Sequence, residues 1–179
     1  MNAGAYGSDV ERVLISAEYY DLSNGEIVSL TDEQMELDYR HSIFLDHPDW
    51  VVLSGVFKLS FGNDEDIRDK MRANMESRRE KQPLEYPSAG SVFKRPVDNF
   101  AAKMIDTAGL KGVTIGGAQV SEKHAGFIIN RGNATAEDVR RLVFLVRDEV
   151  EKLYRYRLEC EIRYVSDGLD GDLGWEETE

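Results

Sequence analysis

The sequence predicts an α+β protein, and three observations lead to that fold class. Residues 13–20 and 50–61 carry apolar side chains at alternate positions, which is typical of half-buried strands. Residues 139–153 place valine and leucine at helical spacing on one face. In the second half, the expected elements follow one another as strand, helix, two strands, helix and strand. This order favours a small sheet with its helices packed on one side.

The first half is expected to be a sheet with little to cover it. Between the strands at 13–20 and 26–30 stands Asn24-Gly25, the pair preferred in a type I′ hairpin turn, where both central residues need positive φ. Residues 50–61 form the next long strand. Because a small sheet with an uncovered face is poorly stable, we expect upstream sequence or a partner chain to cover it.

The second half begins with a helix predicted over residues 64–79, whose thin apolar stripe indicates a surface helix at a domain boundary. Pro83 and Pro87 then interrupt regular structure. We expect a domain at 1–80, a second at 81–165 and an acidic tail at 166–179. The expected elements of the second domain are an extended segment at 91–93, a helix at 99–108 ended by Gly109, strands within 113–120 and 127–130 broken by Gly116-Gly117, a helix from Thr135 with Asp138 in its first turn, and a strand at 158–165.

Charge and composition limit the partners. The net charge of −12 argues against nucleic acid. Residues 166–179 hold six acidic residues and no basic one, which is typical of a solvated, disordered terminus. A single cysteine allows no intrachain disulfide, no apolar run reaches the ~20 residues that span a bilayer, and no signal peptide is visible. We therefore expect a cytoplasmic protein without a membrane partner.

No dinucleotide fingerprint, P-loop or hydrolase elbow is present, and the three histidines lack metal-ligand spacing, so no metal site is predicted. Three polar residues in unusual surroundings could carry chemistry. Ser91 follows Gly90 in a segment of small residues that would let a backbone approach a ligand, although the same residues suit an ordinary turn. Arg40 could grip a carboxylate with its guanidinium fork, or form a surface ion pair. Glu161 could be partly buried with a raised pKa, or face solvent.

Five separated stretches, taken in order from residue 2 to about 165, resemble one known family. They are Asn2-Ala3-Gly4-Ala5-Tyr6-Gly7, Tyr39-Arg40-His41-Ser42-Ile43-Phe44, residues 82–96, Gly116-Gly117-Ala118-Gln119-Val120-Ser121 with His124-Ala125-Gly126-Phe127, and Leu158-Glu159-Cys160-Glu161-Ile162-Arg163. The family is that of the UDP-N-acetylenolpyruvoylglucosamine reductases. The resemblance implies an NADPH- and FAD-dependent enzyme that makes UDP-N-acetylmuramate, an early step of peptidoglycan synthesis.

The resemblance also implies roles for single residues. Ser91 matches the serine that protonates the substrate carbon, Arg40 the arginine at the substrate carboxylate, and Glu161 the catalytic glutamate. Residues expected to bind the substrate are Tyr6, Tyr39, Lys81, Arg95 and His124. Residues expected to pass close to the flavin are Asn2, Ala3, Gly4 and Ala5.

Two departures from the family stand out. Cys160 takes the place of a usual proline, and the N-terminal lobe with its Gly-Gly-x-Ser-Asn-type flavin loop has no counterpart. The resemblance therefore implies that 1–80 is a remnant of an FAD-binding, PCMH-like sheet and 81–165 a substrate-binding domain. We expect weak or no flavin binding and no turnover without the missing lobe. A nucleotide-sugar-binding module without redox activity, and a structural domain of another flavoprotein, remain alternatives.

Overall fold

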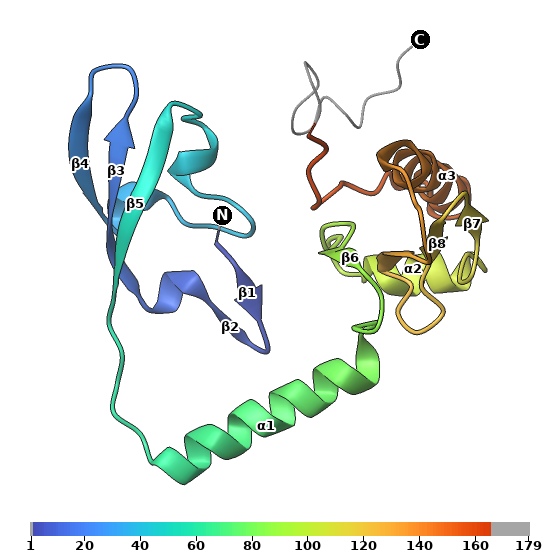
Figure 1. Cartoon of the computed structure of the whole chain (residues 1–179), viewed down its shortest axis with the longest axis horizontal. Coiled ribbons are helices and arrows are strands. Elements are labelled where there is room, and N and C mark those ends of the chain that lie inside the picture. The colour runs from blue at the N-terminus through green and yellow to red at the C-terminus, as the bar shows by residue number, and fades with distance from the viewer. Residues whose placement is uncertain (1, 166–179) are drawn as a thin grey trace. The chain divides into compact units, whose positions relative to one another are not determined.

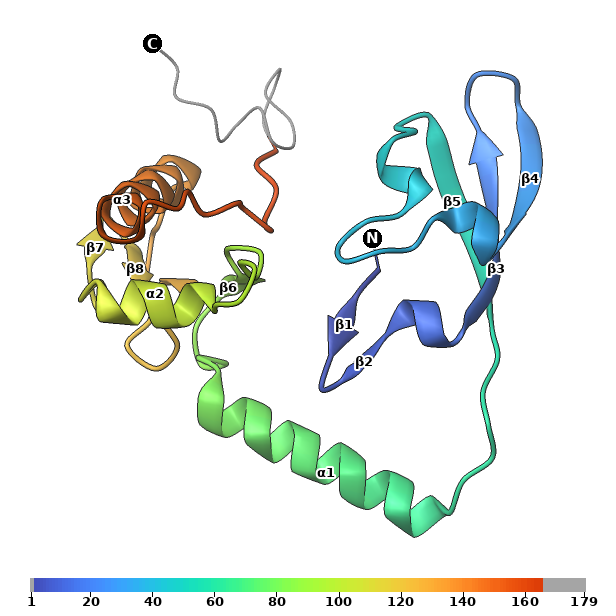
Figure 2. The same cartoon turned by 180° about the vertical axis from the view of Figure 1, so that it is seen from behind.

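The computed structural model describes residues 2–165, and the predicted acidic tail at 166–179 lies outside them. The chain divides into two compact units between Asn74 and Met75, within helix α1 (Asp64–Lys81). Figures 1 and 2 show both helices and strands, and the strands pair in antiparallel sheets. The predicted α+β class is confirmed. The predicted domain limits at 80 and 81 stay a prediction.

The first unit is mainly strands. Its three-stranded antiparallel sheet has the order β4-β3-β5, and a separate hairpin joins β1 to β2. The strands are β1 (Gly4–Ala5), β2 (Ser8–Asp9), β3 (Leu14–Asp21), β4 (Glu26–Thr31) and β5 (Trp50–Phe57), and the short 3-10 helices are η1 (Val10–Arg12), η2 (Glu33–Met35) and η3 (Ile43–Leu45).

The hairpin expected at Asn24-Gly25 forms, but the predicted type I′ turn is wrong. Asp21 pairs with Glu26, so the loop has four residues, and of the Asn24-Gly25 pair only Gly25 has positive φ (77°). The carboxylate of Asp21 accepts hydrogen bonds from the Ser23 amide (2.8 Å) and hydroxyl (2.6 Å). These side-chain bonds stabilise the wider loop, because Asp and Ser satisfy backbone groups that a tight turn would leave to water.

The sheet of the first unit has a small core. Ala17 and Tyr19 of β3 are buried, and Trp50 stacks on Tyr19 at 4.0 Å and on His47 at 3.9 Å between ring centroids. By contrast, the apolar side chains of β5 from Val51 to Phe57 are exposed. Since consecutive strand residues point to opposite faces, β5 offers apolar surface on both faces.

Helix α1 agrees with the predicted surface helix, since none of its residues is buried. Ile67, Met71 and Met75 form its exposed apolar stripe. Its last turn is held from outside, because the Lys123 ammonium donates to the carbonyl of Arg79 (2.7 Å). A cation at this end is favourable, since the last carbonyls of a helix lack intrahelical partners.

The second unit contains a four-stranded antiparallel sheet of order β6-β9-β8-β7. Helices α2 and α3 share one core with this sheet. Buried together in it are Ile105 of α2, Leu142 and Val146 of α3, and Val120 and Ile128 of the sheet. The elements are β6 (Ser88–Ser91), α2 (Ala101–Thr107), β7 (Thr114–Ile115), β8 (Ala118–Val120), β9 (Phe127–Asn130) and α3 (Ala136–Tyr154).

The start of α3 follows the predicted capping chemistry. Thr135 Oγ1 accepts from the Asp138 amide (3.0 Å), and the Asp138 carboxylate accepts from the Thr135 amide (2.9 Å), so both arms of a capping box are present.

The Gly116-Gly117 pair packs against this cap. A Cβ on Gly116 would lie 2.4 Å from the Asp138 carboxylate, and one on Gly117 would lie 2.3 Å from the carbonyl of Gly132. The pair is therefore required by packing.

The strand predicted at 158–165 does not form. Among the described residues, this segment is joined to residues 92–94 by an isolated bridge between Phe93 and Cys160 and by main-chain hydrogen bonds on either side of it. Leu158 is fully buried and anchors the segment as an extended chain on the core. The short extended segment predicted at 91–93 lies earlier in the chain, since β6 begins at Ser88 and ends at Ser91.

Candidate functional site

Ser91 stands at the end of a strand whose register changes just before it. Ser88 pairs with Ile129 and Ser91 with Phe127, with an irregularity between the two pairs. Gly90 has a φ of +88° at this position, which glycine adopts without the cost that a side chain would bring. Such an irregularity re-aims the side chains that follow it. Ser91 is exposed, while the next two residues, Val92 and Phe93, are buried in the core.

Val92 links Ser91 to Glu161. The Val92 amide donates to the carbonyl of Gly126 (2.9 Å), and the Val92 carbonyl accepts from the amide of Glu161 (2.8 Å). Glu161 is half-buried. Two of the three predicted catalytic residues, 70 positions apart along the chain, thus lie on neighbouring backbone segments of the second unit. Two groups that must act on one bound molecule require this kind of fixed juxtaposition.

Positively charged residues follow Ser91. The Lys94 amide donates to the carbonyl of Glu159 (2.9 Å), and its ammonium lies 3.4 Å from the Glu159 carboxylate. The Arg95 guanidinium lies 4.3 Å from the centre of the Phe100 ring, a cation–π arrangement that holds an exposed arginine in place. Lys81 is exposed at the last residue of α1. The predicted role of Lys81 and Arg95 in binding the substrate stays a prediction.

His124 is half-buried and oriented by its own loop. Its Nδ1 accepts a hydrogen bond from the amide of Gly126 (3.1 Å), and its ring meets Phe127 edge-on at 4.9 Å between centroids. Burial lowers the pKa of the imidazole, a hydrogen bond to the main chain of His124 opposes this in part, and the charge of Lys111 lowers the pKa further. His124 is therefore kept neutral near neutral pH, with its proton on Nε2.

In the first unit, Arg40 and Tyr39 lie beside Asn2. An isolated parallel bridge joins Asn2 to Tyr39, and an Arg40 guanidinium nitrogen lies 3.4 Å from the carbonyl of Asn2. Asp38 and His41 exchange main-chain hydrogen bonds of 3.1 and 3.4 Å around the Tyr39-Arg40 turn. Arg40 has a φ of +55°, which is uncommon for a residue other than glycine and often marks a functional position.

The segment expected to face the flavin is a tight hairpin. Tyr6 and Gly7, with φ of 53° and 77°, form the two-residue turn between β1 and β2, and Tyr6 is exposed. The Asn2 side chain is buried and paired with Glu11. Its Nδ2 donates to the Glu11 carboxylate (3.1 Å), and its Oδ1 accepts from the main-chain amide of Glu11 (3.0 Å). The side chain of Asn2 is thus used within the fold, and peptide groups are what this segment can offer to a cofactor.

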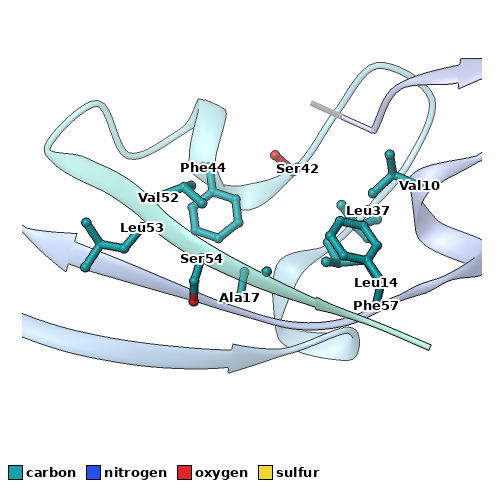
Figure 3. Close-up of a pocket in the computed structure, with 11 residues that line it drawn as sticks. Val10, Leu14, Ala17, Leu37, Ser42, Phe44, Val52, Leu53, Ser54 and Phe57 are labelled. Atoms are coloured by element: carbon teal, nitrogen blue, oxygen red, sulfur yellow. The ribbon is translucent and has the colours of Figure 1, made fainter. Parts of the chain in front are cut away.

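A cavity of about 400 Å³ lies in the first unit, against the sheet (Figure 3). Its lining is almost wholly apolar, and none of the predicted site residues takes part. The alternation of residues 50–61 predicts this apolar surface, but no local signal reveals that it is hollow. The lining residues are Val10, Leu14, Ala17, Leu37, Ser42, Phe44, Val52, Leu53, Ser54, Gly55 and Phe57.

Residues 2–165 contain no group of three or more His, Cys, Asp or Glu side chains arranged to hold a metal ion. Within the same residues, no helix is long and apolar enough to cross a membrane. Of the predicted catalytic residues, Arg40 belongs to the first unit, and Ser91 and Glu161 belong to the second.

Residues 82–165, which contain the Ser91–Val92–Glu161 junction, match the family model for the C-terminal domain of UDP-N-acetylenolpyruvoylglucosamine reductase. This segment belongs to that domain family. The predicted resemblance to the C-terminal portion of the reductase is confirmed.

Curated relatives give the same result over most of the chain. A UDP-N-acetylenolpyruvoylglucosamine reductase from Clostridium tetani is 47% identical over 167 residues, which are 93% of this chain and 54% of the relative. One from Caldicellulosiruptor bescii is 51% identical over 169 residues, 93% of this chain and 53% of the relative. The chain therefore spans about half the length of the curated reductases it matches.

A solved structure is similar as well. The crystal structure of the reductase MurB from Thermus caldophilus matches with a TM-score of 0.78 and 33% identity. The match covers 90% of this chain and 56% of that chain. The similarity includes both the strand-rich first unit and the reductase C-terminal domain.

Proposed function

We propose that this chain supplies the catalytic residues of a UDP-N-acetylenolpyruvoylglucosamine reductase, a cytoplasmic enzyme of peptidoglycan synthesis that uses FAD and NADPH. The observation that carries the proposal is the Val92 link, which fixes Ser91 next to Glu161 inside the matched domain. Residues 1–80 would be a remnant of the FAD-binding domain, and residues 81–165 would bind the nucleotide sugar.

The three residues suit the chemistry of reducing an enol ether conjugated to a carboxylate. Addition of a hydride builds negative charge on that carboxylate, and the Arg40 guanidinium can stabilise it by a bidentate interaction worth several kcal/mol in a dry site. Ser91 then donates its hydroxyl proton to the substrate carbon. A neutral hydroxyl is a weak acid, but the enolate-like intermediate is a strong base. Glu161 assists at the intermediate or in the path of the proton.

The residues present fit FAD only in part. Peptide groups of Asn2 to Ala5 would lie against it, with Tyr6 beside the substrate, whereas the Asn2 amide is already paired with Glu11. FAD, when bound, supplies the hydride that it receives from NADPH. We therefore propose that this chain alone binds FAD weakly and does not turn over.

A partner should complete the first unit, and we propose that it is the N-terminal lobe that the curated reductases carry outside the matched region. Among the described residues, β5 pairs with β3 and with no other strand. Val51 and Val52, which pair with Tyr20 and Tyr19 of β3 and so point to opposite faces, are both about half exposed. A second copy added edge to edge would leave both faces open, whereas a lobe with its own strands and helices could cover them.

The test is to co-express the full chain with the part of the Clostridium tetani reductase that lies outside the matched region. We expect a one-to-one complex with stoichiometric FAD absorbance and NADPH oxidation that depends on the enolpyruvyl substrate. Leu53→Lys should prevent the complex, whereas Leu153→Lys, on α3 and similarly exposed, should not. A complex that binds FAD yet never oxidises NADPH would contradict the proposed reaction.

The alternative is a nucleotide-sugar-binding module without redox activity. It is supported by the second unit having a complete core of its own. Titration calorimetry of the chain with UDP-N-acetylglucosamine separates the two. Tight binding that Ser91→Ala leaves unchanged, combined with no activity after the lobe is added, would favour the module.

A further inference from the structure

We propose that His124 is a positioning residue for Ser91, acting through the main chain of Gly126. This inference rests on the proposed role of Ser91 as the proton donor. It gives His124 a task different from the direct contact with the substrate that the family resemblance implies.

The connection runs through two consecutive hydrogen bonds. His124 Nδ1 accepts from the Gly126 amide (3.1 Å), and the Gly126 carbonyl accepts from the Val92 amide (2.9 Å). Phe127, next to Gly126, pairs with Ser91 in the sheet. The imidazole thus hydrogen-bonds to the main chain of Gly126, and this same main-chain segment pairs with the end of β6.

Gly126 has little freedom to move in this arrangement. It is buried, and a Cβ at this position would lie 3.0 Å from His124 Cε1 and 3.3 Å from the Cβ of Ala102 in α2. The Cα of Gly126 therefore lies close between the imidazole and the first turn of α2. Because protein interiors are close-packed, a change in the ring is transmitted to Gly126 rather than absorbed by a void.

His124 itself is fixed by its loop. The buried hydroxyl oxygen of Ser121 accepts from the amides of Lys123 and His124, both at 3.2 Å. The Phe127 amide donates to the His124 carbonyl (3.0 Å). Because both the amide and the carbonyl of His124 are hydrogen-bonded, its ring is suited to set the position of a neighbouring strand.

Protonation of the ring would break the connection. Nδ1 can accept from Gly126 only while it carries no proton, so an imidazolium would turn N–H toward N–H. Burial and the charge of Lys111 oppose protonation of this ring and outweigh a hydrogen bond to the main chain of His124, so the pKa of the imidazole is lowered. Ser91 should therefore keep its position at neutral pH and lose it when His124 is finally protonated in acid.

The experiment is heteronuclear NMR of the full chain, which needs no turnover. In the unsubstituted chain we expect Nε2-protonated His124 and amide signals of Gly126 and Val92 that follow its titration. His124→Phe keeps a ring against Phe127 but removes the acceptor, and should shift the Gly126, Ser91 and Val92 signals. His124→Asn, whose oxygen can accept in place of Nδ1, should restore most of the shifts. His41→Phe in the first unit is the control and should leave them unchanged.

Nδ1 protonated at neutral pH, or unchanged Ser91 and Val92 signals in a folded His124→Phe chain, would overturn the proposal. In the lobe-completed enzyme, His124→Phe should lower kcat by ~10- to 100-fold with KM little changed, as misplacement of a reacting group does. If the NMR shifts occur but Ser91→Ala does not slow that enzyme, the proposed function of Ser91 fails and the positioning role of His124 stands.

Discussion

The main-chain carbonyl of Val92 accepts a 2.8 Å hydrogen bond from the amide of Glu161. One peptide group thus joins the strand that ends in Ser91 to the segment that carries Glu161. Since Val92 is almost completely buried, neither neighbour can shift without disturbing the core. The most direct predictions concern these two residues.

In the lobe-completed enzyme, Ser91→Ala should lower kcat by ~10²–10⁴-fold, because general acid catalysis contributes about this much. FAD content should not change, since the substitution removes only a hydroxyl from an exposed residue. Stopped-flow absorbance would follow flavin reduction and reoxidation separately. Ser88→Ala, exposed in the same strand, is the matched control and should retain activity. Equal loss in both variants would show that the strand, rather than the Ser91 hydroxyl, is required.

Arg40 combines a charge with an uncommon backbone conformation. Arg40→Gly should not destabilise the first unit by its backbone, because glycine adopts a φ of +55° readily and relieves ~1 kcal/mol of strain. It should nevertheless abolish turnover in the lobe-completed enzyme. Arg40→Lys should lose much of the activity, since an ammonium lacks the bidentate fork. Steady-state kinetics and thermal unfolding check both parts, with Arg12→Lys as a surface control. Full activity in Arg40→Lys would contradict a bidentate interaction between the Arg40 guanidinium and the substrate carboxylate.

Gly117 is predicted to be more sensitive than Gly109. Gly117→Ala would drive a Cβ to 2.3 Å from the Gly132 carbonyl, and we expect a loss of ~3 kcal/mol in the free energy of unfolding of the second unit. Gly109→Ala meets no atom within 4 Å and should cost only the ~1 kcal/mol of a left-handed backbone (φ +72°). Urea denaturation followed by circular dichroism compares the two. Equal losses would mean that the hairpin can move away from α3.

The capping box of α3 should make the second unit sensitive to acid. Hydrogen bonds from the main chain and side chain of Thr135, and one from the main chain of Gly117, lower the pKa of Asp138 below its ordinary value of 3.8. Stability from this carboxylate is complete above about pH 4 and is lost as the pH falls through the lowered pKa.

Asp138→Asn should therefore flatten the decline in the free energy of unfolding as the pH falls below about 4. Glu137→Gln removes a neighbouring charge that makes no cap bond, and should leave the slope nearly unchanged. Urea titrations at several pH values measure it. If Asp138→Asn leaves the slope of the free energy of unfolding against pH unchanged, groups other than Asp138 cause the acid sensitivity.

The exposed surface of β5 should cause self-association of the chain alone. Leu53→Lys is expected to shift the protein toward the monomer, because a charge on an edge strand opposes pairing between sheets. Light scattering during size exclusion at several concentrations checks this. Leu153→Lys tests whether any added lysine has the same effect. A chain that is already monomeric at high concentration would contradict this expectation.

Local chemistry is what the sequence predicts well here. The capping box of α3 joins Thr135 to Asp138, and α2 ends just before Gly109, so both features follow from residues close together in the chain. The hairpin near Gly25 follows too, but its turn type does not, because Asp21 and Ser23 outside the predicted pair stabilise a wider loop. The positive φ of Arg40 has no signal in residue type, since arginine rarely adopts it.

By itself, the sequence determined the α+β class, the main helices, and the resemblance that singles out Arg40, Ser91 and Glu161. Only the tertiary structure decided that residues 158–165 form no strand, that Val92 joins Ser91 to Glu161, and that His124 lies on Gly126. The physical reason is sequence distance. A cap or a turn closes within a few residues, whereas a hydrogen bond across 69 positions forms only after the core has brought both segments together.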